Sequence, residues 1–176
     1  MSVVAVFGSS NLKKNLIDYE KAVHLGKLIA QSGYDIVTGG YDGTMEAVLK
    51  GADSYPVNKL GVTTEFFSTR EKNDFVHEEI KVQTYLQRLT KMIEMADAFI
   101  FLPGGTGTLL ELAAVWALKE RGMFEQKPLI CIGEQWSEVI QTMGFYSETV
   151  IDKFNLIKHV ESIEDAIVHL NNKMNL

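Results

Sequence analysis

Residues 97–108 read DAFIFLPGGTGT, an apolar run that ends in a segment of glycine and threonine. The nearly continuous apolar character of 97–102 is typical of a strand that is buried on both faces of a parallel sheet. The apolar segment 108–121 then predicts a helix. Glycine in the intervening turn lets a ligand approach the backbone closely, beside the free amides of a helix N-terminus. The stretch therefore predicts a central strand, a ligand-facing turn and a helix.

Short apolar runs alternate with helical patterns along the rest of the chain. We expect strands at 3–7, 35–38, 59–64, 79–83, 97–102, 128–132 and 155–159, the last at an edge. Helices are expected at 18–31, 44–52, 85–96, 108–121, 136–143 and, after a capping box at Ser162 and Asp165, up to 172. This alternation predicts one domain over residues 1–176. Its fold is α/β and Rossmann-like, a doubly wound, mostly parallel sheet with helices on both faces.

The composition excludes several classes of protein. The chain has a formal net charge of −6 and no basic run, so nucleic acid is a poor partner. The single cysteine, Cys131, cannot form an internal disulfide, so we expect a core position and a reducing, cytoplasmic location. No stretch reaches the roughly 20 apolar residues of a membrane span, and residues 1–7 lack the basic start of a signal peptide.

Glycine-rich segments follow three of the expected strands at equivalent places. They are Gly8-Ser9-Ser10, then Gly39-Gly40 with Gly43 and Thr44, and finally Gly104-Gly105-Thr106-Gly107-Thr108. The carboxyl ends of parallel strands open toward one edge of the sheet, which is where such sheets bind ligands. The three segments together predict a shared site for an anion or a nucleotide. The alternative is that the glycines serve the geometry of the connections alone.

Several other kinds of site are disfavoured by spacing. Gly8-Ser9-Ser10 does not match the dinucleotide pattern GxGxxG, and no lysine follows Gly107-Thr108 as it would in a P-loop. His77 stands beside two glutamates without helical ligand spacing, and no lysine lies in a pyridoxal-phosphate context. We therefore expect neither a metal site nor a cofactor.

Residues 103–111, PGGTGTLLE, resemble PGGxGTxxE, the signature of the Lonely guy (LOG) family. Residues 39–47, GGYDGTMEA, resemble that family's GGxxGxMEA segment, which adds Met45 and Glu46 to the candidate binding residues. Residues 6–10, VFGSS, resemble its first phosphate-side loop. The resemblance covers most of the chain.

The resemblance implies an enzyme that cleaves the N-glycosidic bond of a nucleoside 5′-monophosphate. AMP or its N6-substituted cytokinin form would give free base and ribose 5-phosphate. The implied catalytic residues are Glu111 and Arg88, and the implied assembly is a homodimer or higher homo-oligomer. A carboxylate suits the oxocarbenium-like state of such a reaction, and arginine offers a charged planar fork to phosphate or ribose. The alternatives are a helix-start acid at Glu111 and a surface charge at Arg88.

The chain also departs from the family pattern. Leu86, Gln87 and Leu89 occupy positions at which the family carries histidine, glutamate and lysine, and Leu110 replaces a frequent glutamate. Molybdenum-cofactor carrier proteins share the fold and a similar signature. The second hypothesis is therefore a carrier that binds a phosphorylated pterin or nucleotide without cleaving it, and a third is a regulatory nucleotide sensor. Contacts to a base would come from Thr106, the loop 65–75 or a second subunit.

Overall fold

The computed structural model describes residues 1–12, 17–124, 126–146 and 156–174. In these residues a seven-stranded sheet has the order β4-β3-β2-β1-β5-β6-β7, and every neighbouring pair is parallel. The strands are β1 (Val3–Phe7), β2 (Asp35–Thr38), β3 (Lys59–Thr64), β4 (Glu78–Val82), β5 (Ala98–Phe101), β6 (Leu129–Ile132) and β7 (Lys158–Val160). The predicted doubly wound sheet is confirmed, with β7 at an edge.

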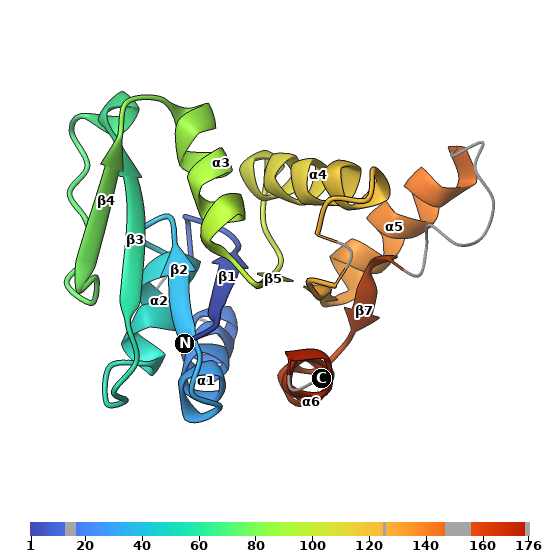
Figure 1. Ribbon diagram of the computed structural model, residues 1–176, viewed down its shortest axis with the longest axis horizontal. Coiled ribbons are helices and arrows are strands. Elements are labelled where there is room, and N and C mark those ends of the chain that lie inside the picture. The colour runs from blue at the N-terminus through green and yellow to red at the C-terminus, as the bar shows by residue number, and fades with distance from the viewer. Residues whose placement is uncertain (13–16, 125, 147–155, 175–176) are drawn as a thin grey trace.

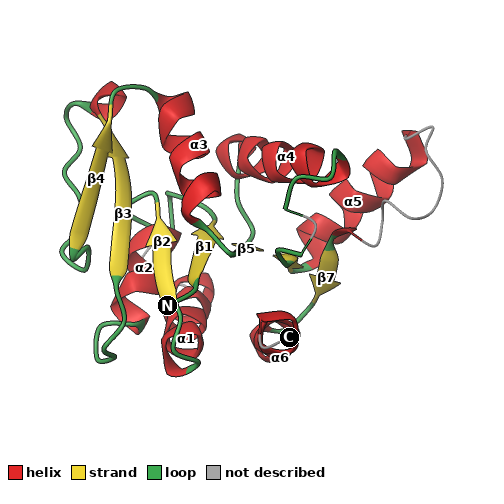
Figure 2. Cartoon of the chain, in the orientation of Figure 1, coloured by secondary structure: helices red, strands yellow, loops and turns green. Residues whose placement is uncertain are grey.

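Three helices cover each face of the sheet in the described part of the chain (Figures 1 and 2). One face carries α1 (Ile17–Gln31), α2 (Thr44–Gly51) and α6 (Ile163–Met174). The other carries α3 (Tyr85–Met95), α4 (Thr106–Glu120) and α5 (Glu134–Tyr146). Ala98 and Ile100 of β5 pack toward the first set of helices, and Phe99 and Phe101 toward the second. This double burial explains why the strand is apolar at every position.

Some element bounds differ from those expected. α4 begins at Thr106, two residues before the predicted start, because Gly105 serves as its N-cap and Gly107 is accommodated within the first turn. α5 begins at Glu134 and β4 at Glu78, both earlier than predicted. The last strand begins at Lys158, whereas residue 155 of the predicted strand lies outside the described residues.

Two helix starts show how side chains set these bounds. The Ser162 hydroxyl oxygen accepts the backbone N–H of Asp165 at 3.0 Å, so the predicted cap at the start of α6 is present. α3 carries a full capping box that the sequence analysis did not foresee. There Thr84 Oγ1 accepts the Gln87 N–H at 3.2 Å, and Gln87 Oε1 accepts the Thr84 N–H at 3.0 Å.

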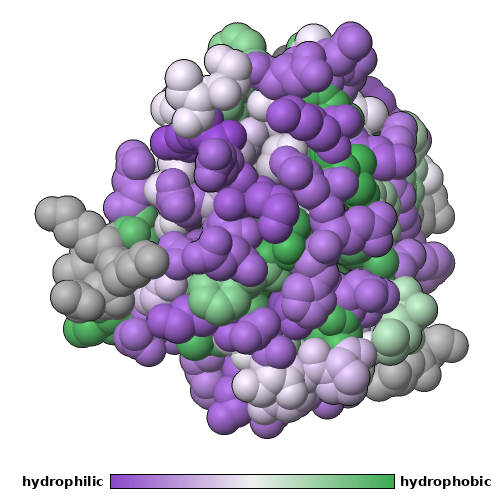
Figure 3. All heavy atoms as spheres, turned by 90° about the vertical axis from the view of Figure 1, so that its left-hand side faces the viewer, coloured by the Kyte–Doolittle hydropathy of each residue, from purple (hydrophilic) through white to green (hydrophobic). Residues whose placement is uncertain are grey.

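The sheet edge at β4 is protected by polar side chains. Glu78, Glu79 and Lys81 of this strand are exposed, and the face on this side of the molecule is largely hydrophilic (Figure 3). Charged side chains on an edge strand discourage pairing with another chain. Among the helices of the described residues, none has the length and apolar character required to cross a membrane.

The chain reverses its direction of winding between β1 and β5. β1 leads through α1 to β2 on one side, whereas β5 leads through α4 to β6 on the other. Because α1 and α4 lie on opposite faces, the loops that follow β1 and β5 diverge. In open α/β sheets, ligands bind in the crevice that such a divergence creates.

Candidate functional site

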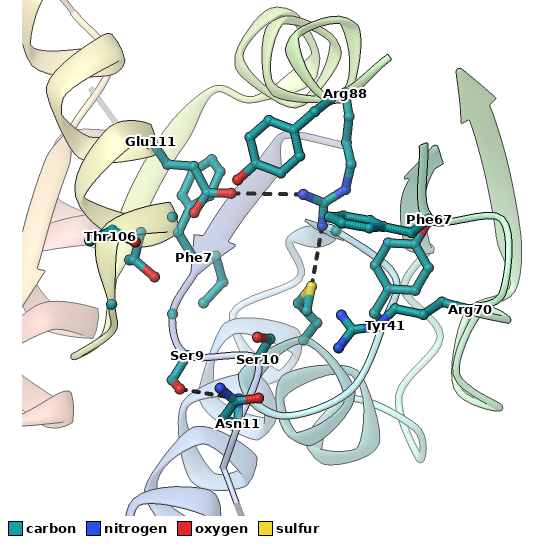
Figure 4. Close-up of a pocket in the computed structure, with 18 residues that line it drawn as sticks. Phe7, Ser9, Ser10, Asn11, Tyr41, Phe67, Arg70, Arg88, Thr106 and Glu111 are labelled. Carbon is teal, nitrogen blue, oxygen red and sulfur yellow. Dashed lines mark hydrogen bonds and ion pairs between the residues drawn. The ribbon is translucent and has the colours of Figure 1, made fainter. Parts of the chain in front are cut away.

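A pocket of about 270 Å³ opens at the carboxyl edge of the sheet, where the loops after β1 and β5 diverge (Figure 4). Its walls come from the loops after β1 and β2, the segment after β3, and the first turns of α3 and α4. The lining residues are Val6, Phe7, Gly8, Ser9, Ser10, Asn11, Gly39, Tyr41, Met45, Phe67, Arg70, Tyr85, Arg88, Gly105, Thr106, Gly107, Thr108 and Glu111.

Most of the residues predicted for the site line this pocket. Members of all three glycine-rich segments do so, together with Met45, Arg88 and Glu111. Five predicted residues lie outside the lining, namely Gly40, Gly43, Thr44, Glu46 and Gly104. The roles of the lining residues toward a ligand remain predictions.

α4 presents its N-terminus to the pocket. Gly105 is the N-cap, and no side chain of the described residues caps the amides that follow it. The first backbone N–H groups of a helix have no acceptor within the helix, and the helix dipole adds partial positive charge there. Thr106, Gly107 and Thr108 of this first turn line the pocket. This wall is therefore suited to a phosphate or another small anion.

Arg88 and Glu111 face each other inside the pocket (Figure 4). They are 5% and 7% exposed, and Arg88 Nη1 lies 3.9 Å from Glu111 Oε1. Arg88 Nε donates to Val62 O at 2.8 Å, and Nη2 lies 3.4 Å from Met45 Sδ. The bond to Val62 holds the guanidinium in place. The separation from Glu111 exceeds hydrogen-bond length, so both charged groups keep capacity to contact a ligand between them.

Burial raises the pKa of Glu111 from 4.5 to about 7, because the desolvation of the carboxylate outweighs the opposing attraction of Arg88. Burial likewise lowers the pKa of Arg88, while Glu111 acts to raise it. A carboxyl group with this pKa changes protonation near neutral pH. Such perturbed groups in a pocket are typical of acid–base or electrostatic catalysis.

The raised pKa of Glu111 predicts that folding stability falls between pH 4.5 and about pH 7. The unfolded chain releases this proton near pH 4.5 and the folded chain only near pH 7. The contribution is thus complete below pH 4.5 and is lost as the pH rises through 7. Urea unfolding should show the wild type losing on the order of 3 kcal/mol more than Glu111→Gln over this range. An equal pH dependence of both proteins would contradict the assignment.

Gly39 provides the space that the Arg88 guanidinium occupies. A Cβ atom at this position would overlap Nη2 of Arg88 and lie 2.7 Å from Met45 Sδ. Gly39 lines the pocket as predicted, but its clearest effect is on the position of Arg88.

Replacing Gly39 by alanine should therefore displace Arg88 and destabilise the fold by about 1–3 kcal/mol through overpacking. Gly105→Ala is the matched control, because a Cβ atom there meets nothing within 4 Å and its φ is −89°. Urea unfolding of both variants measures the difference. Equal stability of Gly39→Ala and Gly105→Ala would show that Arg88 does not depend on this gap.

Gly43 and Thr44 pack against the loop that follows β1, on the side of the loop away from the pocket. Gly43 has φ 72°, and a Cβ atom there would lie 2.5 Å from Ser9 O. The Thr44 N–H donates to the same oxygen at 2.9 Å, and the Thr44 side chain is fully buried. These two residues were predicted to contact a ligand, but the structure places them behind Ser9 and Ser10, which line the pocket.

The other three predicted residues outside the lining have local roles as well. The Gly104 N–H donates to Gln135 Oε1 at 3.1 Å, and its carbonyl accepts from Gln135 Nε2 at 2.7 Å. Gly40 has φ 76°, and its N–H donates to Thr38 Oγ1 at 3.2 Å. Glu46 is buried on α2, at 8% exposure. Hydrogen bonds thus engage the backbone of Gly40 and Gly104, and none of the three residues lines the pocket.

Most of the pocket wall that faces the N-terminus of α4 was not predicted from the sequence. Tyr41 and Tyr85 were not among the predicted site residues. The loop 65–75 was predicted to contact a base, but none of its residues was named. The Phe67 ring lies edge-on to Tyr41 and Tyr85, with centroids 5.7 and 6.0 Å apart. The Arg70 guanidinium carbon lies 5.6 Å from the Phe67 ring centre and 5.9 Å from that of Tyr41. In the sequence Tyr41 directly follows Gly40, which was an available signal, whereas Phe67 and Tyr85 have no glycine beside them.

The residues that depart from the family pattern do not line the pocket. Leu86 and Leu110 are 65% and 44% exposed, and Leu89 is buried in the core. Gln87 is the third residue of α3 and closes its capping box. Within a single chain, the loss of charge at these positions leaves the lining of the pocket unchanged.

Within the described residues, no group of three or more His, Cys, Asp or Glu side chains is arranged to hold a metal ion. The parallel sheet and the pocket at its switch point define a Rossmann-like α/β protein, and the pocket lies where such proteins bind ligands. The chain belongs to the SLOG cluster4 family (LDcluster4), which matches residues 1–163.

Relatives confirm the resemblance to the LOG family. A cytokinin riboside 5′-monophosphate phosphoribohydrolase of Mycobacterium marinum is 32% identical over 160 residues, covering 84% of this chain and 82% of that protein. The enzyme of the same name from Mycobacterium tuberculosis is 30% identical over 158 residues, with the same shares of each chain covered. The reaction class named for these relatives supports an enzyme of the LOG type.

Solved structures share the fold. The molybdenum cofactor binding protein of Rippkaea orientalis superposes with a TM-score of 0.77 at 23% identity, covering 98% of this chain and 97% of that one. The molybdenum cofactor carrier protein of Chlamydomonas reinhardtii gives 0.74 at 20% identity, covering 99% of each chain. At this level of identity the likeness concerns the fold alone.

Proposed function

We propose that this protein hydrolyses the N-glycosidic bond of a nucleoside 5′-monophosphate to free base and ribose 5-phosphate. The observation that carries the proposal is the pair Arg88 and Glu111, which face each other in a pocket walled by the N-terminus of α4. A helix end that attracts phosphate, beside a buried carboxylate, suits a phosphorylated sugar whose reaction develops positive charge. The phosphoribohydrolase names of the Mycobacterium relatives support the same class of reaction.

In this proposal the first turn of α4 and the loop at Ser9 and Ser10 hold the phosphate. The ribose then lies beside Glu111, whose carboxylate stabilises the oxocarbenium-like transition state. The bond between C1′ and the base nitrogen breaks, and both electrons leave with the base. Water adds its hydroxyl to C1′, and its proton ends on the base. Arg88 donates from Nη1 to the ribose or phosphate.

The test is base release from AMP, GMP, CMP and IMP, followed by chromatography and compared with the Glu111→Gln variant. Release that is proportional to the wild-type enzyme and absent from the variant would support the hydrolase. Lack of release from all four nucleotides would overturn it.

A carrier of a phosphorylated pterin or nucleotide is the second candidate. Its motive lies in the sequence, where leucines and a glutamine stand at charged positions of the family; these residues do not line the pocket, and the superposition on molybdenum cofactor carriers concerns the fold. Co-purified pterin fluorescence or molybdenum, together with no base release, would support the carrier. Steady base release would exclude it as the main function.

A homodimer or higher homo-oligomer also forms part of the proposal. Leu86 on α3 and Leu109 and Leu110 on α4 are 65%, 41% and 44% exposed, and apolar side chains at this exposure are suited to a subunit contact. Light scattering measures the mass directly. A cytoplasmic location agrees with the single, buried Cys131.

A further inference from the structure

Arg70 is a second arginine in the pocket, on the wall opposite the N-terminus of α4. It reaches the pocket from the side of Phe67 and Tyr41, whereas Thr106 lies on the other side (Figure 4). Its side chain is exposed and lies near the two aromatic rings. The charge of Arg70 also acts on Arg88, whose pKa it helps to lower, so the two guanidinium groups share one site.

The order of groups across the pocket assigns this wall to the base. In the proposed binding mode, with the phosphate at α4 and the ribose beside Glu111, the base is directed toward the part of the lining that holds Tyr41, Phe67 and Arg70. Phe67, which is half-buried, offers an aromatic ring on which a base can stack, whereas Tyr41 is 2% exposed and has the Arg88 and Arg70 guanidinium groups beside its ring. Tyr41 is held in place by its hydroxyl, which donates to Thr64 O at 3.2 Å and accepts from the Thr64 N–H at 2.9 Å. These two bonds fix the position of the Tyr41 ring at the base of this wall.

We propose that Arg70 reads the edge of the base and that the pocket prefers 6-oxopurine nucleotides, GMP and IMP, to AMP. This inference rests on the proposed function, because it names the base of that substrate. The O6 and N7 atoms of a 6-oxopurine are two adjacent acceptors, which arginine engages with two parallel N–H groups. Adenine presents an amino donor in place of O6, so one bond is lost and two donors face each other.

The rest of the lining agrees with this preference. Glu111 is the only acidic side chain among the described residues that line the pocket, and it faces Arg88 rather than Arg70. No carboxylate of the described lining residues is thus placed on the Arg70 wall to accept from the adenine amino group. A site that selects a base by its hydrogen-bond acceptors needs hydrogen-bond donors, and the Arg70 guanidinium supplies them.

The test compares kcat/KM for GMP, IMP and AMP in the wild type, in Arg70→Met and in Arg121→Met. Arg121 is an exposed arginine at the far end of α4 that donates to Ala117 O at 2.7 Å, so its variant controls for the loss of one positive charge. The wild type and Arg121→Met should prefer GMP and IMP to AMP by about 10- to 100-fold. Arg70→Met should lose most of that preference.

Binding to ribose 5-phosphate separates reading of the base from binding of the phosphate. Its Kd should be unchanged in Arg70→Met, since this ligand has no base. If Arg70→Met weakens ribose 5-phosphate and all three nucleotides equally, Arg70 binds phosphate and the inference is overturned. A wild type that prefers AMP, or that treats the three nucleotides alike, also overturns it.

Calorimetric binding to Glu111→Gln keeps this inference distinct from the proposed function. If no nucleotide is cleaved but the variant still binds GMP and IMP more tightly than AMP, the hydrolase proposal fails and the reading of the base by Arg70 stands. If bases are released with AMP preferred, the hydrolase stands and the role of Arg70 is rejected.

Discussion

Base release should be abolished when Glu111 is replaced by glutamine, while nucleotide binding stays nearly intact. Glutamine keeps the shape of the side chain but cannot carry the negative charge that opposes an oxocarbenium-like state. Loss of such electrostatic stabilisation costs on the order of 10²- to 10³-fold in rate. In the proposed binding mode the ground state is bound through the α4 N-terminus and the loop after β1, whose lining residues the substitution leaves unchanged. The Kd should therefore change only slightly.

Chromatography of the released base and calorimetry with an uncleaved nucleotide measure the two effects separately. Glu94→Gln is the matched control, because Glu94 is an exposed carboxylate on α3 outside the pocket lining. The wild-type rate should also rise with pH through about 7, as Glu111 loses its proton. A Glu111→Gln protein that turns over at the wild-type rate would falsify the catalytic assignment.

Replacing Arg88 by methionine should lower kcat/KM by about 10²- to 10³-fold, since it removes the charged donor that faces Glu111. The substitution also takes away the attraction that restrains the pKa of Glu111. The carboxyl group then remains protonated to higher pH, and the pH–rate profile should move toward the alkaline side.

The pH profile distinguishes this role from a purely structural one. If Arg88 served only to brace Val62 O, its loss would lower stability and leave the pH dependence of the remaining activity unchanged. Arg88→Lys adds a second comparison. Lysine retains a charge but has no planar fork, so it cannot both bond Val62 O and face Glu111 as arginine does. Its kcat/KM should lie between those of the wild type and Arg88→Met.

The order of strands and helices could be predicted from local pattern. β5 is apolar at every position because both of its faces are covered. Such a pattern can be recognised from consecutive residues alone. The glycine-rich segments could likewise be placed at one edge, since all parallel strands end there. The resemblance of residues 103–111 to the LOG signature then implied Glu111, and the same resemblance implied Arg88 as its partner.

Side-chain partners far apart in the chain could not be derived in this way. Gly39 was expected to meet a ligand, yet the atom that excludes a side chain there belongs to Arg88, from a different element. Gln87 was read as a lost carboxylate, although in the fold it closes the cap of α3. Gly104 was expected in the pocket, but its amide is engaged by Gln135 from α5.

By itself, the amino-acid sequence determined the α/β class, the edge of the sheet that carries the site, and the two charged residues at its centre. The class and the edge follow from period and strand direction, which are properties of neighbouring residues, whereas the two charged residues follow from the resemblance to the LOG family. Only the tertiary structure decided that Glu111 is buried enough to hold a pKa near 7 and that Arg70, Phe67 and Tyr41 form the opposite wall. Desolvation and side-chain proximity depend on what other elements bring to the same point in space, and no local pattern carries that information.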